Sequence, residues 1–188
     1  MVRSYNNLYH GWINLYKDSG LTSNDALRQI KSIFKGCKIG HAGTLDPMAK
    51  GILPIALGEA TKTVPYIHEK NKTYLFAIKF GEQTDTDDAT GKIIGKSDRK
   101  PDIEQIKSVL HDYVGPINQI PPIYSAKKFN GIRSYELARK GVVPDMVSKA
   151  KTVHIENIKL VEMNSDSECT IEVTCGTGTY IRSISKHI

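Results

Sequence analysis

One aspartate in this chain occupies a setting that suits covalent chemistry. Asp46 lies in the glycine-rich run of residues 40–47, with His41 earlier in the run and Pro47 directly after it. The two glycines of the run permit close backbone approaches that a side chain would block, and Pro47 biases Asp46 toward an extended conformation. A carboxylate held stiffly in this way can act as a nucleophile when it is desolvated and kept ionised by a nearby cation. The alternative is a polar loop in which Asp46 only caps a turn.

Two further residues extend the chemistry that Asp46 suggests. Tyr74 heads an alternating apolar stretch, and Arg182 ends the glycine-rich segment of residues 176–182. An aromatic ring can stack on a base that has been drawn out of its helix and replace part of the stacking that the base loses. An aspartate, an aromatic ring and an arginine together suit a nucleoside substrate. None of these roles needs a metal or a redox cofactor.

Several familiar ligand sites find no support in the sequence. The acidic run of residues 84–91 has the composition of a calcium loop, but Ala89 stands where a third oxygen ligand belongs and no glutamate closes the loop. The six histidines are scattered without the spacing of metal ligands. Glycine motifs that bind nucleotide phosphates are absent. We therefore expect no metal and no cofactor.

Positive charge is concentrated in one segment of the chain. The formal net charge is +6, and residues 127–151 hold seven basic side chains against two acidic ones. Tyr124, Phe129 and Tyr135 interleave with these cations, and such a mixture suits contacts to phosphates together with stacking on bases. The alternative is a solvated, lysine-rich face without a ligand.

The length and cysteine content bound the class of protein. A chain of 188 residues suits one domain with one core and needs no disulfide or metal support. Its three cysteines form no paired motif, as expected of reduced thiols in a cytosolic protein. Residues 1–7 lead into no long apolar run, so we expect neither a secretory signal nor a membrane span, and a cytoplasmic location.

Periodicity along the chain predicts the elements that must position these side chains. Apolar alternation predicts strands, and helical spacing after a capping hydroxyl or a proline predicts helices. The predicted strands cover residues 12–16, 73–80, 153–161 and 169–175, and the predicted helices begin near residues 22–23 and at Pro101. The last two strands form a hairpin through residues 164–167. Because helices and strands mix without a strict βαβ rhythm, we expect an α+β fold with a mixed, largely antiparallel central sheet flanked by helices.

Seven blocks of the sequence, in one order, resemble the TruB family of bacterial tRNA pseudouridine synthases. The resemblance covers essentially the whole chain and is carried by residues 11–14, 40–47, 51–54, 58–62, 84–87, 121–128 and 178–182. It implies a pseudouridine synthase fold and a catalytic domain over residues 1–188. It also implies an isomerase that converts uridine 55 in the T-loop of tRNA to pseudouridine, by breaking the C–N glycosidic bond and forming a C–C bond to the same base.

The same resemblance assigns a role to each site residue. It implies that Asp46 is the nucleophile, with its point of attack on base or sugar left open, and that Arg182 pairs with it and keeps it charged. His41 would contact the flipped nucleotide, with a hydrogen-bonded core imidazole as the alternative. Tyr74 would stack on the uracil and assist a later proton transfer, and Tyr180 would line the uridine pocket. The alternatives are ordinary packing for both tyrosines and a surface ion pair for Arg182.

The implied partner is the T-arm of tRNA, bound by a monomer without a membrane. Lys62, Lys127 and Lys128 are candidates for phosphate contacts, because lysine serves there as a point charge. Affinity for RNA is then expected to fall as salt rises.

Three departures from the family pattern keep other functions open. Residues 16–18 read Tyr-Lys-Asp where Asp-Lys-Pro is usual, and Thr177 replaces a usual lysine. Since relatives continue beyond the position of Ile188, we expect the chain to lack the C-terminal end of the catalytic domain and any PUA domain. One alternative is a non-catalytic tRNA-binding or tRNA-folding protein. The other is a guide-RNA-dependent relative that acts on ribosomal RNA.

Overall fold

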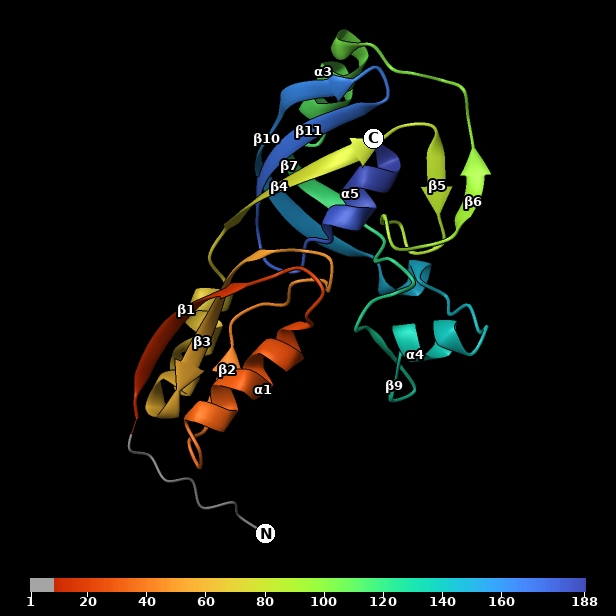
Figure 1. The fold of residues 1–188 in the computed structure, drawn as a ribbon. Coiled ribbons are helices and arrows are strands. Elements are labelled where there is room, and N and C mark those ends of the chain that lie inside the picture. The colour runs from red at the N-terminus through yellow and green to blue at the C-terminus, as the bar shows by residue number, and fades with distance from the viewer. Residues whose placement is uncertain (1–8) are drawn as a thin grey trace. The chain divides into compact units, whose positions relative to one another are not determined.

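The computed structural model describes residues 9–188, which divide into two compact units (Figure 1). The first unit extends to Lys70 and the second runs from Asn71 to Ile188. Each unit has its own cluster of buried apolar side chains, whereas the chain length had suggested a single core. The difference arises because each unit builds a separate sheet and covers it with its own helices. The prediction about residues 1–7 lies outside the described residues.

The first unit is a three-stranded antiparallel sheet covered by one helix. The strand order is β1 (Gly11–Lys17), β3 (Gly51–Leu57) and β2 (Ile39–His41). Helix α1 (Ser23–Ile33) begins where the sequence predicted, because the Thr22 side chain caps it and Asp25 bonds back in a capping box. Its buried residues pack on Leu53 and Ile55 of β3. A 3-10 turn, η1 (Gly58–Thr63), and α2 (Val64–His68) complete the unit.

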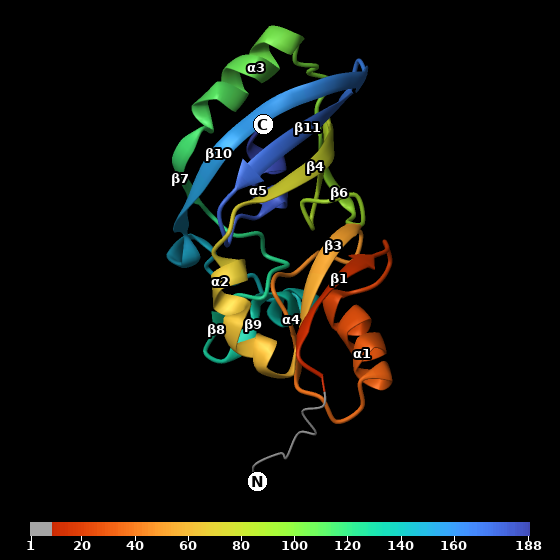
Figure 2. The ribbon, with the colours of Figure 1, turned by 90° about the vertical axis from the view of Figure 1, so that its left-hand side faces the viewer.

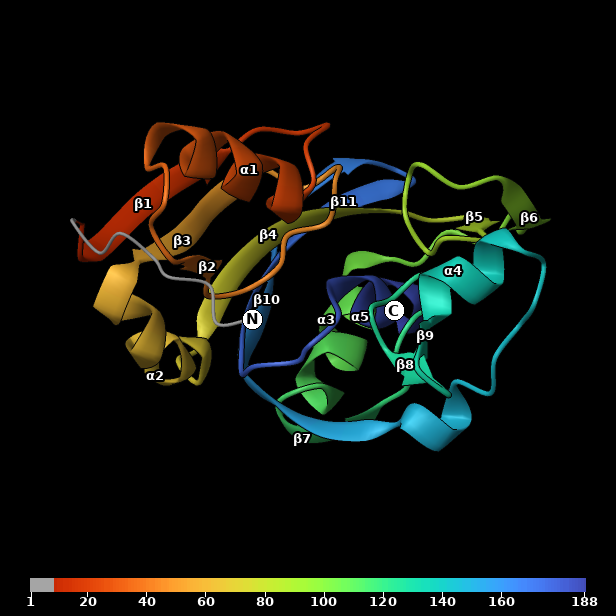
Figure 3. The same cartoon turned by 90° about the horizontal axis from the view of Figure 1, so that it is seen from below.

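The second unit centres on a four-stranded antiparallel sheet. Its strand order is β4 (Lys72–Lys79), β11 (Glu168–Cys175), β10 (Lys151–Ser165) and β7 (Gly115–Gln119). Helices α3 (Ile103–Asp112) and α5 (Ile181–His187) lie on the same side of this sheet (Figure 3). Ile106 and Leu110 of α3 and Ile184 of α5 join the core with the buried side chains of β11. The sheet therefore has one covered face.

Strand β10 is longer than predicted and irregular. It pairs with β11 along the hairpin visible in Figure 2, but the register shifts between Ile155 and Asn157 and again between Leu160 and Glu162. An extra residue at each shift is a β-bulge. The first bulge explains why Ile155 and Ile158, three positions apart, are both buried.

Smaller elements fill the connections of the second unit. They are β5 (Glu82–Thr84), β6 (Ile93–Lys96), β8 (Lys128–Phe129), β9 (Ile132–Arg133), α4 (Ser134–Arg139) and η2 (Val147–Lys149). Strand β7 was not predicted, because its Gly-Pro start was interpreted only as the end of a helix. Proline is tolerated there since β7 is an edge strand. All strand pairs recorded within residues 9–188 are antiparallel, which confirms the α+β prediction.

Candidate functional site

The loop that carries Asp46 is fixed on both sides of this residue. The hydroxyl of Ser23 accepts a hydrogen bond from the Leu45 amide at 2.9 Å and donates to the Leu45 carbonyl at 3.1 Å. Beyond Asp46, the amide of Gly20 donates to the Pro47 carbonyl at 2.7 Å. Asp46 itself is half-buried. Its backbone is therefore held by partners that precede it in the sequence by more than twenty residues.

A buried lysine organises the same loop. Lys17 is 1% exposed, and its ammonium group donates to four carbonyl oxygens: Ala49 at 2.6 Å, Leu21 at 2.7 Å, Asp18 at 2.9 Å and Pro47 at 3.5 Å. Burial lowers the pKa of Lys17, and the negative charges of Asp18 and Asp46 offset that effect only in part. Lys17 is thus a cation that interacts electrostatically with Asp46.

The sequence motifs assign no role to Lys17, although the alternation of β1 carries a signal for it. In β1 the inward-facing positions alternate, and Lys17 follows Ile13 and Leu15 in that phase. A lysine in an apolar phase must find several acceptors, because a buried ammonium without partners is costly. Although residues 16–18 depart from the usual Asp-Lys-Pro of the family, the central lysine is the same in both.

His41 lies at the end of β2, with its ring Nδ1 in polar contact with the carbonyl oxygen of Gly43. Gly43 has φ of +135°, which favours glycine. At Gly40 the expected close backbone approach is not observed. A Cβ built there meets no described atom within 4 Å, and its φ is not positive.

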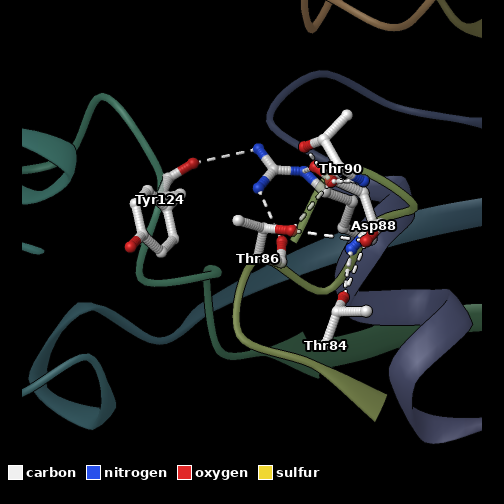
Figure 4. Close-up of polar contacts among 6 residues, drawn as sticks. Thr84, Thr86, Asp88, Thr90 and Tyr124 are labelled. Carbon is white, nitrogen blue, oxygen red and sulfur yellow. Dashed lines mark hydrogen bonds and ion pairs between the residues drawn. The ribbon is translucent and has the colours of Figure 1, made fainter. Parts of the chain in front are cut away.

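Arg182, at the start of α5, is held by the acidic loop of residues 84–91. Figure 4 shows Thr84, Thr86, Asp88 and Thr90 of this loop together with Tyr124. Its Nη1 atom donates to the Thr86 carbonyl at 3.1 Å, and its Nη2 atom donates to the Tyr124 carbonyl at 3.0 Å. Its Nε atom lies 3.8 Å from the Asp88 carboxylate, and both side chains are nearly buried, at 12% and 10% exposure. The planar guanidinium is thereby oriented by three groups from two segments.

Asp88 is fixed by its own loop. One carboxylate oxygen accepts from the Thr86 hydroxyl at 2.8 Å and from the amide and hydroxyl of Thr90 at 2.9 and 2.6 Å. Burial alone would raise the pKa of Asp88, but these hydrogen bonds and the charge of Arg182 together hold the pKa below its usual range. Asp88 is therefore an oriented anion beside Arg182.

Sequence reasoning found no structural role for this loop, although residues 84–87 form one of the seven family blocks. The run of acidic residues and threonines was set aside as an unsuitable calcium loop, yet it supplies internal hydrogen bonds and a carboxylate for an arginine about ninety residues away. Within residues 9–188, no group of three or more histidine, cysteine or acidic side chains is arranged to hold a metal ion. Alternating aspartates and threonines were the available signal, since both favour local side-chain to backbone bonds.

Tyr74 lies on the covered face of β4, where it packs against the core of the second unit. Burial raises the pKa of Tyr74 to about 12, with a smaller contribution from Cys175. The phenol is therefore neutral at ordinary pH and is available as a hydrogen-bond donor.

Tyr180 is anchored through its backbone. The buried side chain of Gln119 accepts from the Tyr180 amide at 2.7 Å and donates to the Tyr180 carbonyl at 3.1 Å. Since Tyr180 directly precedes α5, these two bonds fix the start of the helix that carries Arg182.

The predicted phosphate contacts lie on exposed or half-buried positions. Lys62 is exposed and pairs with Glu59, while Lys127 is half-buried and Lys128 is exposed. In the same basic segment, the Lys149 ammonium lies 5.0 Å from the ring centre of Phe129, and the Arg139 guanidinium 5.4 Å from that of Tyr135. A cation therefore covers one face of each ring.

The candidate site residues divide between the two units. Asp46, His41 and Lys62 belong to the first unit, and the remaining candidates to the second; these are Tyr74, Lys127, Lys128, Tyr180 and Arg182. The pairing of Asp46 with Arg182 joins residues of different units and stays a prediction. Within residues 9–188 no helix is long and apolar enough to cross a bilayer.

The chain matches a known protein family. The profile for the N-terminal domain of TruB family pseudouridylate synthases matches residues 31–181. The tRNA pseudouridine synthase B of Bartonella henselae is 49% identical over 176 residues, covering 94% of this chain and 54% of that protein. That of Wolbachia pipientis is 46% identical over 182 residues, covering 96% of this chain and 51% of that protein. The chain thus spans about half the length of these relatives.

Solved structures give a consistent result. A Cbf5-Nop10-Gar1 complex contains a chain that matches with a TM-score of 0.67 and 28% identity, covering 94% of this chain and 43% of that one. An H/ACA ribonucleoprotein bound to a substrate RNA containing 2'-deoxyuridine matches with a TM-score of 0.66 and 25% identity, covering 94% and 41%. This likeness confirms the fold that the seven sequence blocks predicted.

Proposed function

Because the chain belongs to the TruB family of pseudouridylate synthases, we propose that it converts uridine 55 in the T-loop of tRNA to pseudouridine. The observation that carries the proposal is the loop around Asp46, in which Ser23 and Lys17 fix the backbone on both sides of a half-buried carboxylate. A preorganised nucleophile needs no rearrangement before it reacts.

Asp46 is the nucleophile in this proposal, and Arg182 supplies the opposing charge. A carboxylate reacts as an anion, so a cation that favours ionisation also keeps the group ready. Lys17 also favours the ionised form of Asp46, because its positive charge interacts with that carboxylate. The guanidinium of Arg182 is oriented before RNA binds, because Thr86, Asp88 and Tyr124 contact it.

The remaining candidates bind the extruded nucleoside. Tyr74 stacks on the uracil and, as a neutral phenol, assists proton transfer through a group that stays protonated to about pH 12. Tyr180 lines the uridine pocket from the start of α5, and His41 contacts the flipped nucleotide. No metal or cofactor enters the proposed reaction, because the carboxylate and the base supply the groups that react.

The RNA is held mainly through its phosphates. Lys62, Lys127 and Lys128 offer exposed or half-buried ammonium groups for these contacts. The protein acts as a cytoplasmic monomer on the T-arm in this proposal. Three buried free thiols, Cys37, Cys169 and Cys175, suit that reducing compartment.

The proposal is tested with an unmodified T-arm hairpin that carries tritium at C5 of the target uridine. A C–C bond formed at C5 displaces the tritium, so its release measures isomerisation. We expect release with the wild-type chain and none with Asp46→Asn, which keeps the shape of the side chain but lacks the nucleophile. RNA affinity, measured by fluorescence anisotropy, should stay within a few fold because phosphates dominate it.

The same assay separates the two alternatives. A non-catalytic tRNA-binding or tRNA-folding protein would bind the hairpin without releasing tritium. A guide-dependent relative would release tritium only when a guide RNA is added. The identity to tRNA pseudouridine synthase B proteins, at 46–49%, exceeds the 25–28% identity to chains of the H/ACA complexes, which favours a tRNA substrate.

A further inference from the structure

Helix α5 attaches to the acidic loop at two points. Arg182 and Lys186 lie four residues apart, and such residues share one face of a helix. Arg182 approaches Asp88, and the Lys186 ammonium lies 2.9 Å from the carboxylate of Asp87. Two cations one helical turn apart therefore form ion pairs with two consecutive aspartates of the loop, Asp87 and Asp88.

The ion pair between Lys186 and Asp87 differs from an ordinary surface ion pair. The Asp87 side chain is only 8% exposed, although that of Lys186 is 41% exposed. Exposed ion pairs are weak, whereas removing the partner of a buried charge leaves that charge without compensation. Asp87 also has φ of +55°, in the left-handed region, which aspartate adopts more readily than most residues other than glycine but which remains uncommon for it. Its conformation therefore depends on the partners that hold it, and Lys186 is one of them.

Asp87 lies between the two residues of the loop that orient Arg182. The carbonyl of Thr86 accepts from Arg182 Nη1, and the carboxylate of Asp88 faces Arg182 Nε. A rotation of the backbone at Asp87 would therefore move both groups relative to the guanidinium.

The loop is closely packed and hydrogen-bonded, so its backbone has little room for such a rotation. A Cβ added at Gly91 would overlap atoms of Asp85 and Thr86. The Thr84 hydroxyl donates to the Asp88 carbonyl at 2.7 Å and accepts from the Asp88 amide at 3.1 Å. Because Asp88 is held on both sides of its backbone, Asp87 cannot change its conformation without straining these bonds.

We propose that Lys186 is a positioning residue, which sets the orientation of Arg182 by fixing Asp87 and, through it, Thr86 and Asp88. The proposal rests on the proposed function for its kinetic consequence, since it assigns Lys186 to the placement of a catalytic arginine. It assigns Lys186 no contact with RNA.

The kinetic test compares Lys186→Met, which keeps an unbranched chain without charge, with Lys186→Arg, which keeps the charge. For tritium release from the T-arm hairpin, kcat should fall about tenfold in Lys186→Met with KM within about twofold, as expected when only transition-state interactions are lost. Lys186→Arg should restore kcat. Asp87→Asn should resemble Lys186→Met, and the double variant should be no worse than either single variant, because both remove one interaction.

A second readout does not depend on activity. The Thr90 amide donates to Asp88 and the Lys92 amide donates to Asp85, so their hydrogen exchange reports on the loop. Exchange at both amides should speed up in Lys186→Met and in Asp87→Asn. The matched control is Lys107→Met on α3, which removes an exposed i,i+3 pair with Glu104 and should leave exchange and kcat unchanged.

These measurements separate the possible outcomes. If the wild-type chain releases no tritium, the proposed function fails, and the exchange data still decide whether Lys186 fixes the loop. A rise in KM at constant kcat would make Lys186 an RNA contact and overturn the proposal. Unchanged exchange and kcat would also overturn it. If circular dichroism shows that Lys186→Met does not fold, the comparison of Asp87→Asn with Lys186→Arg gives the answer.

Discussion

The ammonium nitrogen of Lys17 lies 2.6 Å from the carbonyl oxygen of Ala49, and this bond ties the end of β1 to the far side of the Asp46 loop. The same ammonium reaches the Leu21 and Asp18 carbonyls before α1. One buried cation thus joins two loops that the bonds of Gly20 and Ser23 also connect. The placement of Asp46 therefore depends in part on a residue that makes no contact with the substrate in the proposal.

Replacing Lys17 tests this dependence. Lys17→Met should lower the free energy of unfolding by about 2–4 kcal/mol, because buried carbonyl groups lose their donor. It should also lower kcat for the T-arm hairpin, since the Asp46 loop loses a fixed anchor. Thermal and urea unfolding measure the first effect. Lys50→Met, at an exposed position of the same segment, is the control and should change neither quantity.

Arg182→Lys should reduce kcat/KM by about 100-fold or more, although the charge is kept. Lysine cannot reach Thr86, Asp88 and Tyr124 at once with the geometry of a planar fork, and a small misplacement of a catalytic group costs about that factor. Single-turnover kinetics on the T-arm hairpin give the rate. A rate equal to wild type would show that a point charge is sufficient and that the fork is not used.

The lowered pKa of Asp88 predicts a stability that depends on pH. An aspartate whose pKa is lower in the folded state contributes stability above its unfolded pKa of about 4, and this is lost as pH falls through the folded value. Asp88→Asn should therefore lower Tm at pH 7, and the difference from wild type should shrink below pH 4. Asp98→Asn, at an exposed position, serves as the reference. A difference that stays constant to the lowest pH would mean that the charge of Asp88 is not the source.

Tyr74 should titrate later than an ordinary tyrosine. Its pKa of about 12 lies above the usual 10, so the folded protein keeps a proton that the unfolded chain loses between these values. The stability that Tyr74 contributes is complete below pH 10 and is lost as pH rises through 12. The difference in phenolate absorbance between wild type and Tyr74→Phe gives the titration, and a transition centred at pH 10 or below would contradict the prediction.

Much of the fold was predictable because its elements carry local signals. The start of α1 was predicted from a hydroxyl that caps it, and the hairpin of β10 and β11 from alternation and a polar turn. The division into two cores was not predictable, since apolar periodicity shows which side chains are buried but not which strands share a sheet. Strand β7 was missed because Pro116 at its start also fits the end of a helix.

The candidate site was predictable only in part. The blocks around Asp46 and Arg182 drew attention to the groups proposed to react. The residues that hold them received no role: Lys17 was noted only within the departure from the family pattern at residues 16–18, and Asp88 directly follows the family block of residues 84–87. Their roles depend on distances between residues remote in sequence, and a single sequence does not contain those distances.

The irregular pairing of β10 bears on which changes in chain length the second unit can accept. Glu156 and Val161 are the surplus residues at two of its register shifts, so deleting either one would still leave the neighbouring apolar side chains pointing into the core. Deleting His154, which pairs in register with Pro116, would instead invert every side chain that follows it. The bulges therefore let β10 gain or lose single residues within the strand, while the length of the turn between β10 and β11 stays the same.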